Sequence, residues 1–271
     1  MISLKKYSLL TFFVLSYLIM IVGVFIILLL REIGGLSLLE YIMLLVAVTS
    51  PTISAILLTG LNDGKEGLKK LLSGFGKWKV GPFWYIAGFI LILLPIIVAV
   101  FYIIISGFVP IIASNMTIGI FFLSLLENLI MGPLSEEAGW RGYALPRLES
   151  RMSALKSSLV LGIIWACWHL PLYLIEPRMP FYIYIVIVIV LAILFTWAYN
   201  NTGGSLIIPI IFHFSFNATG RYITGTIQLM PLMIFYISAS IMLTIYTILV
   251  IAYYGPKRLS RKPESELPFE I

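Results

Sequence analysis

Residues 9–30 read LLTFFVLSYLIMIVGVFIILLL, an unbroken apolar stretch without a charged side chain. About 20 apolar residues are what a helix needs to cross the hydrocarbon core of a bilayer. Lipid offers the backbone no hydrogen bonds, and the stretch lacks the alternation of a β-barrel strand, so we expect a helix. The stretch is too long for a signal-peptide core and no cleavage site follows it, so we expect it to be retained.

The same pattern recurs along the chain, which has 271 residues. Hydrophobic residues make up 61% and charged residues 11%, whereas soluble domains contain about 45–50% and about 25%. The sequence therefore predicts an all-α polytopic membrane helical bundle with about eight transmembrane helices, or six or seven if a segment is re-entrant. The predicted spans are residues 9–30, 38–59, 83–106, 111–131, 157–175, 181–199, 206–219 and 232–254.

The distribution of basic residues predicts the orientation of these spans. The chain has 18 Lys and Arg, and in an eight-span arrangement all except Arg31, Arg178 and Arg221 fall on one side. Basic loops mark the cytoplasmic side, so we expect a multi-pass protein of the cell membrane with both termini cytoplasmic. We assign residues 1–256 to a single integral membrane domain and residues 257–271 to a polar cytoplasmic tail without fixed structure. The net charge of +6 then indicates membrane lipids as partners, and not nucleic acid.

Acidic and imidazole side chains in or near the apolar stretches are the candidates for a functional site, because ionisable groups at membrane depth are costly. The first cluster is residues 132–142, GPLSEEAGWRG. We expect Gly132-Pro133 to end one helix and Ser135 to cap the next. The cluster would then lie at the start of a helix.

The two adjacent glutamates of this cluster should have different surroundings. Glu137 and Arg141 are four residues apart, share a helix face and can pair, whereas Glu136 projects about 100° away. One carboxylate would be held ionised by the arginine, and the other could take up and release a proton. A surface helix with an ordinary ion pair would give the same pattern.

Both histidines of the chain lie in predicted spans. His169 follows Trp165 by four residues, and His213 precedes Asn217 by four, which places imidazole and amide on one helix face. Each histidine alone could be a structural hydrogen bond between helices. Together with the glutamates, however, they supply the groups needed for proton transfer, water activation and oxyanion stabilisation. We therefore favour catalysis.

With these motifs the chain resembles the CAAX protease and bacteriocin-processing family (CPBP, or Abi) of intramembrane proteases, which includes the type II CAAX prenyl endopeptidase. The resemblance spans roughly residues 130–220 and rests on three motifs in the family's order. These are Glu136-Glu137-x-x-x-Arg141, Trp165-x-x-x-His169 and His213-x-x-x-Asn217. The family usually has phenylalanine where Trp165 stands, which is a mild departure that keeps the aromatic character.

The resemblance implies a fold of eight membrane helices with a conical active-site cavity and a protease core at about residues 115–222. It implies that Glu136 is the general base and that His169 helps it to activate water. His213 and Asn217 would hold the tetrahedral oxyanion. The supporting positions would be Glu137, Arg141 and Trp165.

The metal content of such a site stays open at the sequence level. Glu136, His169 and His213 could ligate zinc, but the HExxH helix of zincins is absent. The single cysteine also excludes a CxxC metal knuckle. We favour a site without metal or other cofactor and keep zinc as the alternative.

The leading functional hypothesis is an intramembrane endopeptidase that acts on a membrane-anchored polypeptide, such as a prenylated CAAX tail or a bacterial leader peptide. A non-catalytic membrane protein of the same family, an immunity factor or scaffold, is the main alternative. Its polar residues would then be structural. A proton-coupled carrier is a third hypothesis, because carriers also use intramembrane Glu and His.

Overall fold

The computed structural model describes residues 8–35, 37–112, 117–176, 179–220, 227–228 and 231–268, and most of these residues are helical. The α-helices are α1 (Ser8–Glu32), α2 (Ser37–Val48), α3 (Ser50–Ser73), α4 (Pro82–Ser106), α5 (Ile118–Leu129), α6 (Ser135–Glu137), α7 (Leu145–Glu149), α8 (Ala154–Trp168), α9 (Phe181–Asn201), α10 (Ile207–Thr219) and α11 (Leu232–Tyr254). The remaining helical turns are η1 (Gly74–Gly76), η2 (Ile130–Leu134), η3 (Ala138–Ala144), η4 (Leu170–Leu174) and η6 (Glu264–Glu266).

Six helical segments of the described chain are long and apolar enough to cross a membrane. They are Ser8–Glu32, Pro82–Ser106, Ile118–Glu149, Ala154–Leu174, Phe181–Asn201 and Leu232–Tyr254. The pair α2–α3, bent by 56°, makes a seventh candidate, and the apolar α10 has only 13 residues. The predicted all-α membrane bundle is confirmed, and its count of about eight is reached only by including the bent pair and α10.

The predicted span 111–131 begins too early. Helix α5 starts at Ile118, where the side chain of Thr117 accepts a hydrogen bond from Ile120 N (3.3 Å). Upstream, Ile111–Ile112 (β1) pairs antiparallel with Ile227–Gln228 (β2). A short apolar run rich in isoleucine fits a strand as well as a helix, so hydropathy alone could not place this boundary.

The expected helix break at Gly132-Pro133 is wrong. The backbone continues from α5 through the π-helical turn η2, the short α6 and a second π-helical turn, η3, into α7. Proline removes one backbone donor, and the helix accommodates this by widening to a π turn instead of ending. Ser135 is not a cap, because its Oγ donates to the carbonyl of Ile130 (2.6 Å) and bonds to Thr49 Oγ1 (2.9 Å).

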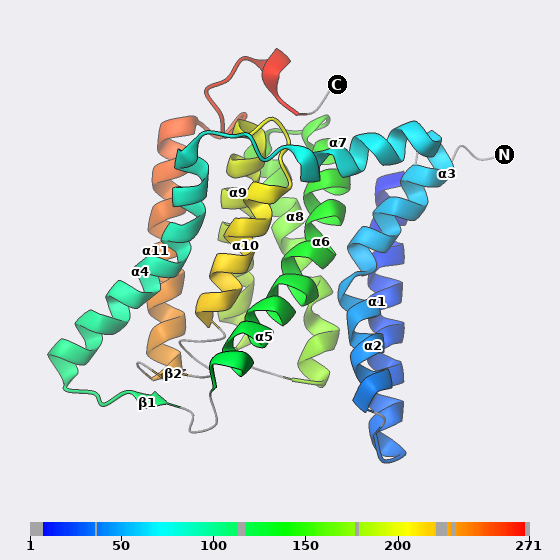
Figure 1. Ribbon diagram of the computed structural model, residues 1–271. Coiled ribbons are helices and arrows are strands. Elements are labelled where there is room, and N and C mark those ends of the chain that lie inside the picture. Colours follow the sequence, from blue (N-terminus) through cyan, green and yellow to red (C-terminus); the bar gives the residue numbers. More distant parts are fainter. Residues whose placement is uncertain are drawn as a thin grey trace.

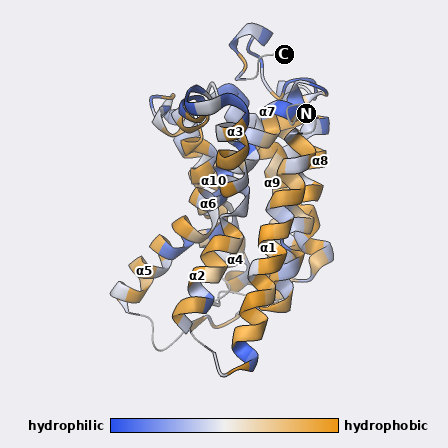
Figure 2. Cartoon of the chain, turned by 90° about the vertical axis from the view of Figure 1, so that its right-hand side faces the viewer, coloured by the Kyte–Doolittle hydropathy of each residue, from blue (hydrophilic) through white to orange (hydrophobic). Residues whose placement is uncertain are grey.

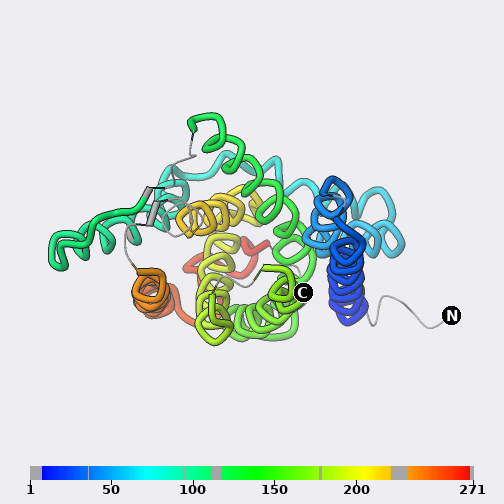
Figure 3. The backbone as a smooth tube through the Cα atoms, turned by 90° about the horizontal axis from the view of Figure 1, so that it is seen from below, coloured from blue at the N-terminus to red at the C-terminus, as the bar shows by residue number. Residues whose placement is uncertain are grey.

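The segments that carry the motifs lie at the centre of the bundle. Figures 1 and 3 show α8, α9, α10 and the α5–α7 segment between α1–α3 on one side and α4 with α11 on the other. Helix α9 is the most enclosed of them, since every residue from 190 to 201 is buried. The motifs are therefore held in the interior. The conical cavity that the resemblance implies stays a prediction.

The polar parts of the chain gather at one end of the bundle, near α3 and α7 (Figure 2). At this end Lys77 Nζ donates to the carbonyl of Gly203 (2.7 Å), and Arg147 Nη2 lies 3.9 Å from Oδ2 of Asp63. The start of α1 and the C-terminal residues lie at the same end (Figure 1). Four basic residues used to predict the orientation lie outside the described residues, namely Lys5, Lys6, Arg178 and Arg221.

The expectation that the tail has no fixed structure is wrong for residues 257–268, although residues 269–271 lie outside the described part. Asn200 Nδ2 donates to the carbonyl of Arg258 (2.9 Å), and Asn201 Nδ2 donates to the carbonyl of Leu259 (2.8 Å). The side chain of Leu259 is buried. Side chains at the end of α9 thus bind backbone carbonyls of the tail. The polar composition of the tail gives no sign of these contacts.

Candidate active site

The adjacent glutamates of the first motif are buried inside the bundle. Glu136 and Glu137 form part of α6, between the π turns η2 and η3, and their exposed fractions are 3% and 0%. π-Helical turns change the direction of the side chains that follow and often occur at functional sites. Buried carboxylates need partners, and the structure supplies different ones for each glutamate.

Glu137 pairs with Arg141, as the four-residue spacing predicted. Its Oε1 accepts from Arg141 Nη1 (3.0 Å) and also lies 2.8 Å from Nδ1 of His213, which α10 provides. Arg141 is fully buried, with its guanidinium 4.4 Å from the ring centroid of Trp165 and 4.6 Å from that of Phe195. Arg141 is therefore part of the interior. The expectation that it is one of the basic residues of a cytoplasmic loop is wrong.

The Glu137 carboxylate fixes the orientation of His213. A carboxylate only accepts hydrogen bonds, so Nδ1 of His213 carries the hydrogen in this pair. The opposite ring atom, Nε2, is then turned away from Glu137 and remains available. Sequence spacing did not reveal this contact, because the two residues are 76 positions apart.

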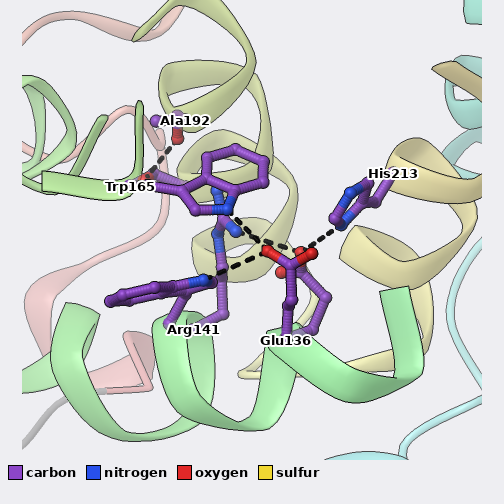
Figure 4. Close-up of polar contacts among 8 residues, drawn as sticks. Glu136, Arg141, Trp165, Ala192 and His213 are labelled. Atoms are coloured by element: carbon purple, nitrogen blue, oxygen red, sulfur yellow. Dashed lines mark hydrogen bonds and ion pairs between the residues drawn. The ribbon is translucent and has the colours of Figure 1, made fainter. Parts of the chain in front are cut away.

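Glu136 is held by two tryptophans through a single oxygen. Its Oε2 accepts from Nε1 of Trp165 (2.6 Å) and from Nε1 of Trp140 (3.2 Å). Figure 4 shows the Glu136 carboxylate among Trp165, Arg141 and His213. Both indoles bind the same oxygen, and no side chain of the described residues hydrogen-bonds the other oxygen, Oε1.

Polar atoms of three candidate site residues converge beside the backbone of Gly132. The position that a Cβ on Gly132 would occupy is 3.0 Å from Asn217 Nδ2, 3.7 Å from His213 Nε2 and 4.0 Å from Glu136 Oε1. These distances agree with the expectation that His213 and Asn217 lie on one face of their helix. The free oxygen of Glu136 faces the same point.

His169 bonds to the backbone of Trp165 and is not among the three atoms nearest to the Cβ position of Gly132. It caps the C-terminus of α8, and its Nδ1 lies 2.8 Å from the carbonyl oxygen of Trp165. A carbonyl only accepts, so Nδ1 carries the hydrogen and Nε2 keeps its lone pair in the neutral ring. The ring packs edge-on against Trp168 and Tyr184, and within the described part of the chain it makes no hydrogen bond to Glu136.

Sequence reasoning overlooked two residues of the site, Trp140 and Gly132. Each is four positions from Glu136, one after it and one before it, and therefore lies on the same helix face. That spacing was visible in the sequence. A tryptophan at one of these positions and a glycine at the other are nevertheless ordinary in an apolar helix, and only the structure shows what they contact.

The zinc ligand set kept as the alternative is not assembled in the described residues. They contain no group of three or more His, Cys, Asp and Glu residues arranged to hold a metal ion. Glu136, His169 and His213 therefore do not form the three-ligand set that zinc needs.

Fold and site together define a polytopic helical membrane protein with a centre of buried glutamates and a buried histidine next to the half-buried Asn217. Residues 117–219 match the family described as type II CAAX prenyl endopeptidase Rce1-like. This segment contains all the motif residues. The chain is also 34% identical over 106 residues to the curated CAAX prenyl protease 2 of Methanococcus maripaludis.

These two matches confirm the resemblance drawn from the three motifs. The alignment to the archaeal protease covers 35% of this chain and 39% of the relative. The chain thus matches well under half of the relative's length.

Proposed function

We propose that this protein is an intramembrane endopeptidase that hydrolyses a peptide bond in a membrane-anchored substrate, with a prenylated CAAX-type tail as the preferred class. The observation that carries the proposal is the convergence of Glu136 Oε1, His213 Nε2 and Asn217 Nδ2 within 4.0 Å of one point. These atoms are one proton acceptor and two groups able to hydrogen-bond an oxygen. The family match and the name of the archaeal relative support the choice of substrate class.

The first step is the activation of water by Glu136. Oε1 takes a proton from a water molecule while the two indole N–H groups remain on Oε2 and keep the carboxylate in place. The resulting hydroxide adds to the scissile carbonyl carbon. His169, whose Nε2 keeps its lone pair, assists by orienting the water.

The second step is stabilisation of the tetrahedral intermediate. Asn217 Nδ2 donates to the oxyanion, and His213 Nε2 donates when it carries a proton. Glu137 keeps the His213 ring turned so that Nε2 faces this position. The protonated Glu136 then transfers its proton to the leaving amine, the C–N bond breaks, and the carboxylate is regenerated.

We also propose that the polar end of the bundle faces the cytoplasm of a cell membrane, so that both termini are cytoplasmic. Support comes from the basic residues of this end and from the C-terminal segment that packs there. A peptide attached to the inner leaflet by a lipid would approach the site from this side. Membrane lipids are then the permanent surroundings of the protein.

The proposal is tested with the purified full-length protein in proteoliposomes. A farnesylated CAAX-type peptide and the same peptide without the lipid are incubated with it, with and without a metal chelator, and the products are identified by mass spectrometry. We expect cleavage of the farnesylated peptide, slower or no cleavage of the unmodified one, and no effect of the chelator. No cleavage of either peptide would remove the proposal and leave the scaffold hypothesis, and inhibition by the chelator would restore the zinc alternative.

A further inference from the structure

Polar atoms of Asn217, His213 and Glu136 surround the position that a Cβ on Gly132 would occupy. It lies in the π turn η2 and is buried, and its successor is Pro133. A Cβ at this position would lie among side-chain ends from two elements, Glu136 of α6 and His213 with Asn217 of α10. The missing side chain therefore leaves open the space that these groups face.

Two other helical glycines, Gly139 and Gly162, serve a different purpose. A Cβ on Gly139 would lie 2.4 Å from the backbone of Pro51, and a Cβ on Gly162 would lie 2.9 Å from Cα of Ile189. These glycines allow helices to approach each other closely. Gly132 differs because its nearest neighbours are the polar ends of proposed site residues and not the backbone of a packed helix.

The backbone of Gly132 does not itself require glycine. The residue has helical geometry and is not among the glycines with positive φ. An alanine can therefore adopt this conformation, and in a helical segment alanine is more favourable than glycine. The reason for a glycine here lies in the space beside it.

We propose that Gly132 forms the seat for the scissile peptide group, so that the carbonyl of the substrate rests against its bare Cα between Glu136 Oε1 and the donors on Asn217 and His213. This inference rests on the proposed peptidase function. Hydrogen bonds to the oxyanion require a donor–acceptor distance of about 2.7–3.2 Å. A methyl group 3.0 Å from Asn217 Nδ2 would occupy the space in which that oxygen has to lie.

The consequence is a loss in the chemical step and not in folding. A methyl group on residue 132 must displace either the substrate carbonyl or the Asn217 amide, and a displacement of about 1 Å in a reacting geometry can cost on the order of a hundredfold in rate. Contacts made by the lipid and the rest of the peptide would be kept. We therefore expect kcat to fall much more than KM rises.

The test compares Gly132→Ala with Gly119→Ala in the full-length protein in proteoliposomes. Gly119 lies on α5, is exposed, and a Cβ there meets only Thr117 Oγ1 at 3.9 Å, so this control makes the same chemical change away from the site. Gly139→Ala serves as a packing reference, because it meets the Pro51 backbone. Each variant is measured for kcat and KM on the farnesylated peptide and for its Tm.

We expect Gly132→Ala to lose on the order of a hundredfold in kcat, with a Tm no lower than that of the wild type, while Gly119→Ala behaves like the wild type. Wild-type kcat in Gly132→Ala would overturn the inference and leave the peptidase proposal standing. A loss of activity accompanied by a fall in Tm like that of Gly139→Ala would also overturn it, because it would show a packing role. If the wild-type protein cleaves nothing, the proposed function fails, and this inference fails with it.

Discussion

Replacing Trp165 by phenylalanine removes the shorter of the two hydrogen bonds to the Glu136 carboxylate, the one of 2.6 Å from Nε1. Phenylalanine keeps an aromatic ring at this position, so the backbone and the aromatic contacts should be kept. What changes is the number of hydrogen bonds to Oε2 of Glu136, which falls from two to one. The carboxylate then depends on the longer bond from Trp140 (3.2 Å) and can rotate away from the position in which Oε1 meets the water.

The size of the effect follows from the strength of the lost bond. A hydrogen bond to a charged group contributes about 1.5–3 kcal/mol, and each 1.36 kcal/mol in the barrier is about a tenfold change in rate. We therefore expect Trp165→Phe to lower kcat/KM by between roughly 10-fold and 150-fold. Trp140→Phe should have a smaller effect, because its bond is longer.

The assay is peptide cleavage in proteoliposomes, with Trp197→Phe as the matched control. Trp197 is also buried, and its Nε1 has no hydrogen-bond partner within the described residues, so the control removes the same volume from the core without changing the site. It should retain the wild-type rate. Unchanged or higher activity of Trp165→Phe would refute the idea that the indoles orient the base, and an equal loss in Trp197→Phe would attribute the effect to packing.

Two further predictions concern stability. Arg141→Ala leaves the fully buried Glu137 without its arginine ion-pair partner. Breaking a buried pair typically costs about 3–5 kcal/mol, so we expect a lower Tm in detergent. An unchanged Tm would show that the pair is not needed for folding. Asn201→Ala removes the bonds to the carbonyl of Leu259 and to Ser260 Oγ and should destabilise the C-terminal segment by about 1–3 kcal/mol. Limited proteolysis should then cut residues 257–268 faster than in the wild type, and equal rates would contradict the packing described for this segment.

Local features of the site could be predicted from sequence spacing. The pairing of Glu137 with Arg141 and the shared face of His213 and Asn217 follow from the 3.6-residue period of a helix. The all-α bundle follows from apolar runs of sufficient length. These features depend on residues close together in the chain, so their geometry is set by the helix alone.

Contacts between distant elements could not be predicted in this way. The bond from His213 to Glu137 joins α10 to α6, and the bond from Trp165 to Glu136 joins α8 to α6. The glutamates of α6 lie between two π turns, and hydropathy carries no signal for such turns. The order in residues 257–268 depends on asparagines at the end of α9, which are remote in sequence.

The most direct test of Glu136 as the general base compares Glu136→Gln with Glu127→Gln. Glutamine keeps nearly the same shape but accepts no proton at neutral pH, and Glu127 lies on the preceding helix α5, outside the site contacts described above. Product release from the farnesylated peptide is measured for both variants and for the wild type in proteoliposomes. We expect release by the wild type and by Glu127→Gln and none by Glu136→Gln; release by Glu136→Gln at the wild-type rate would contradict the mechanism.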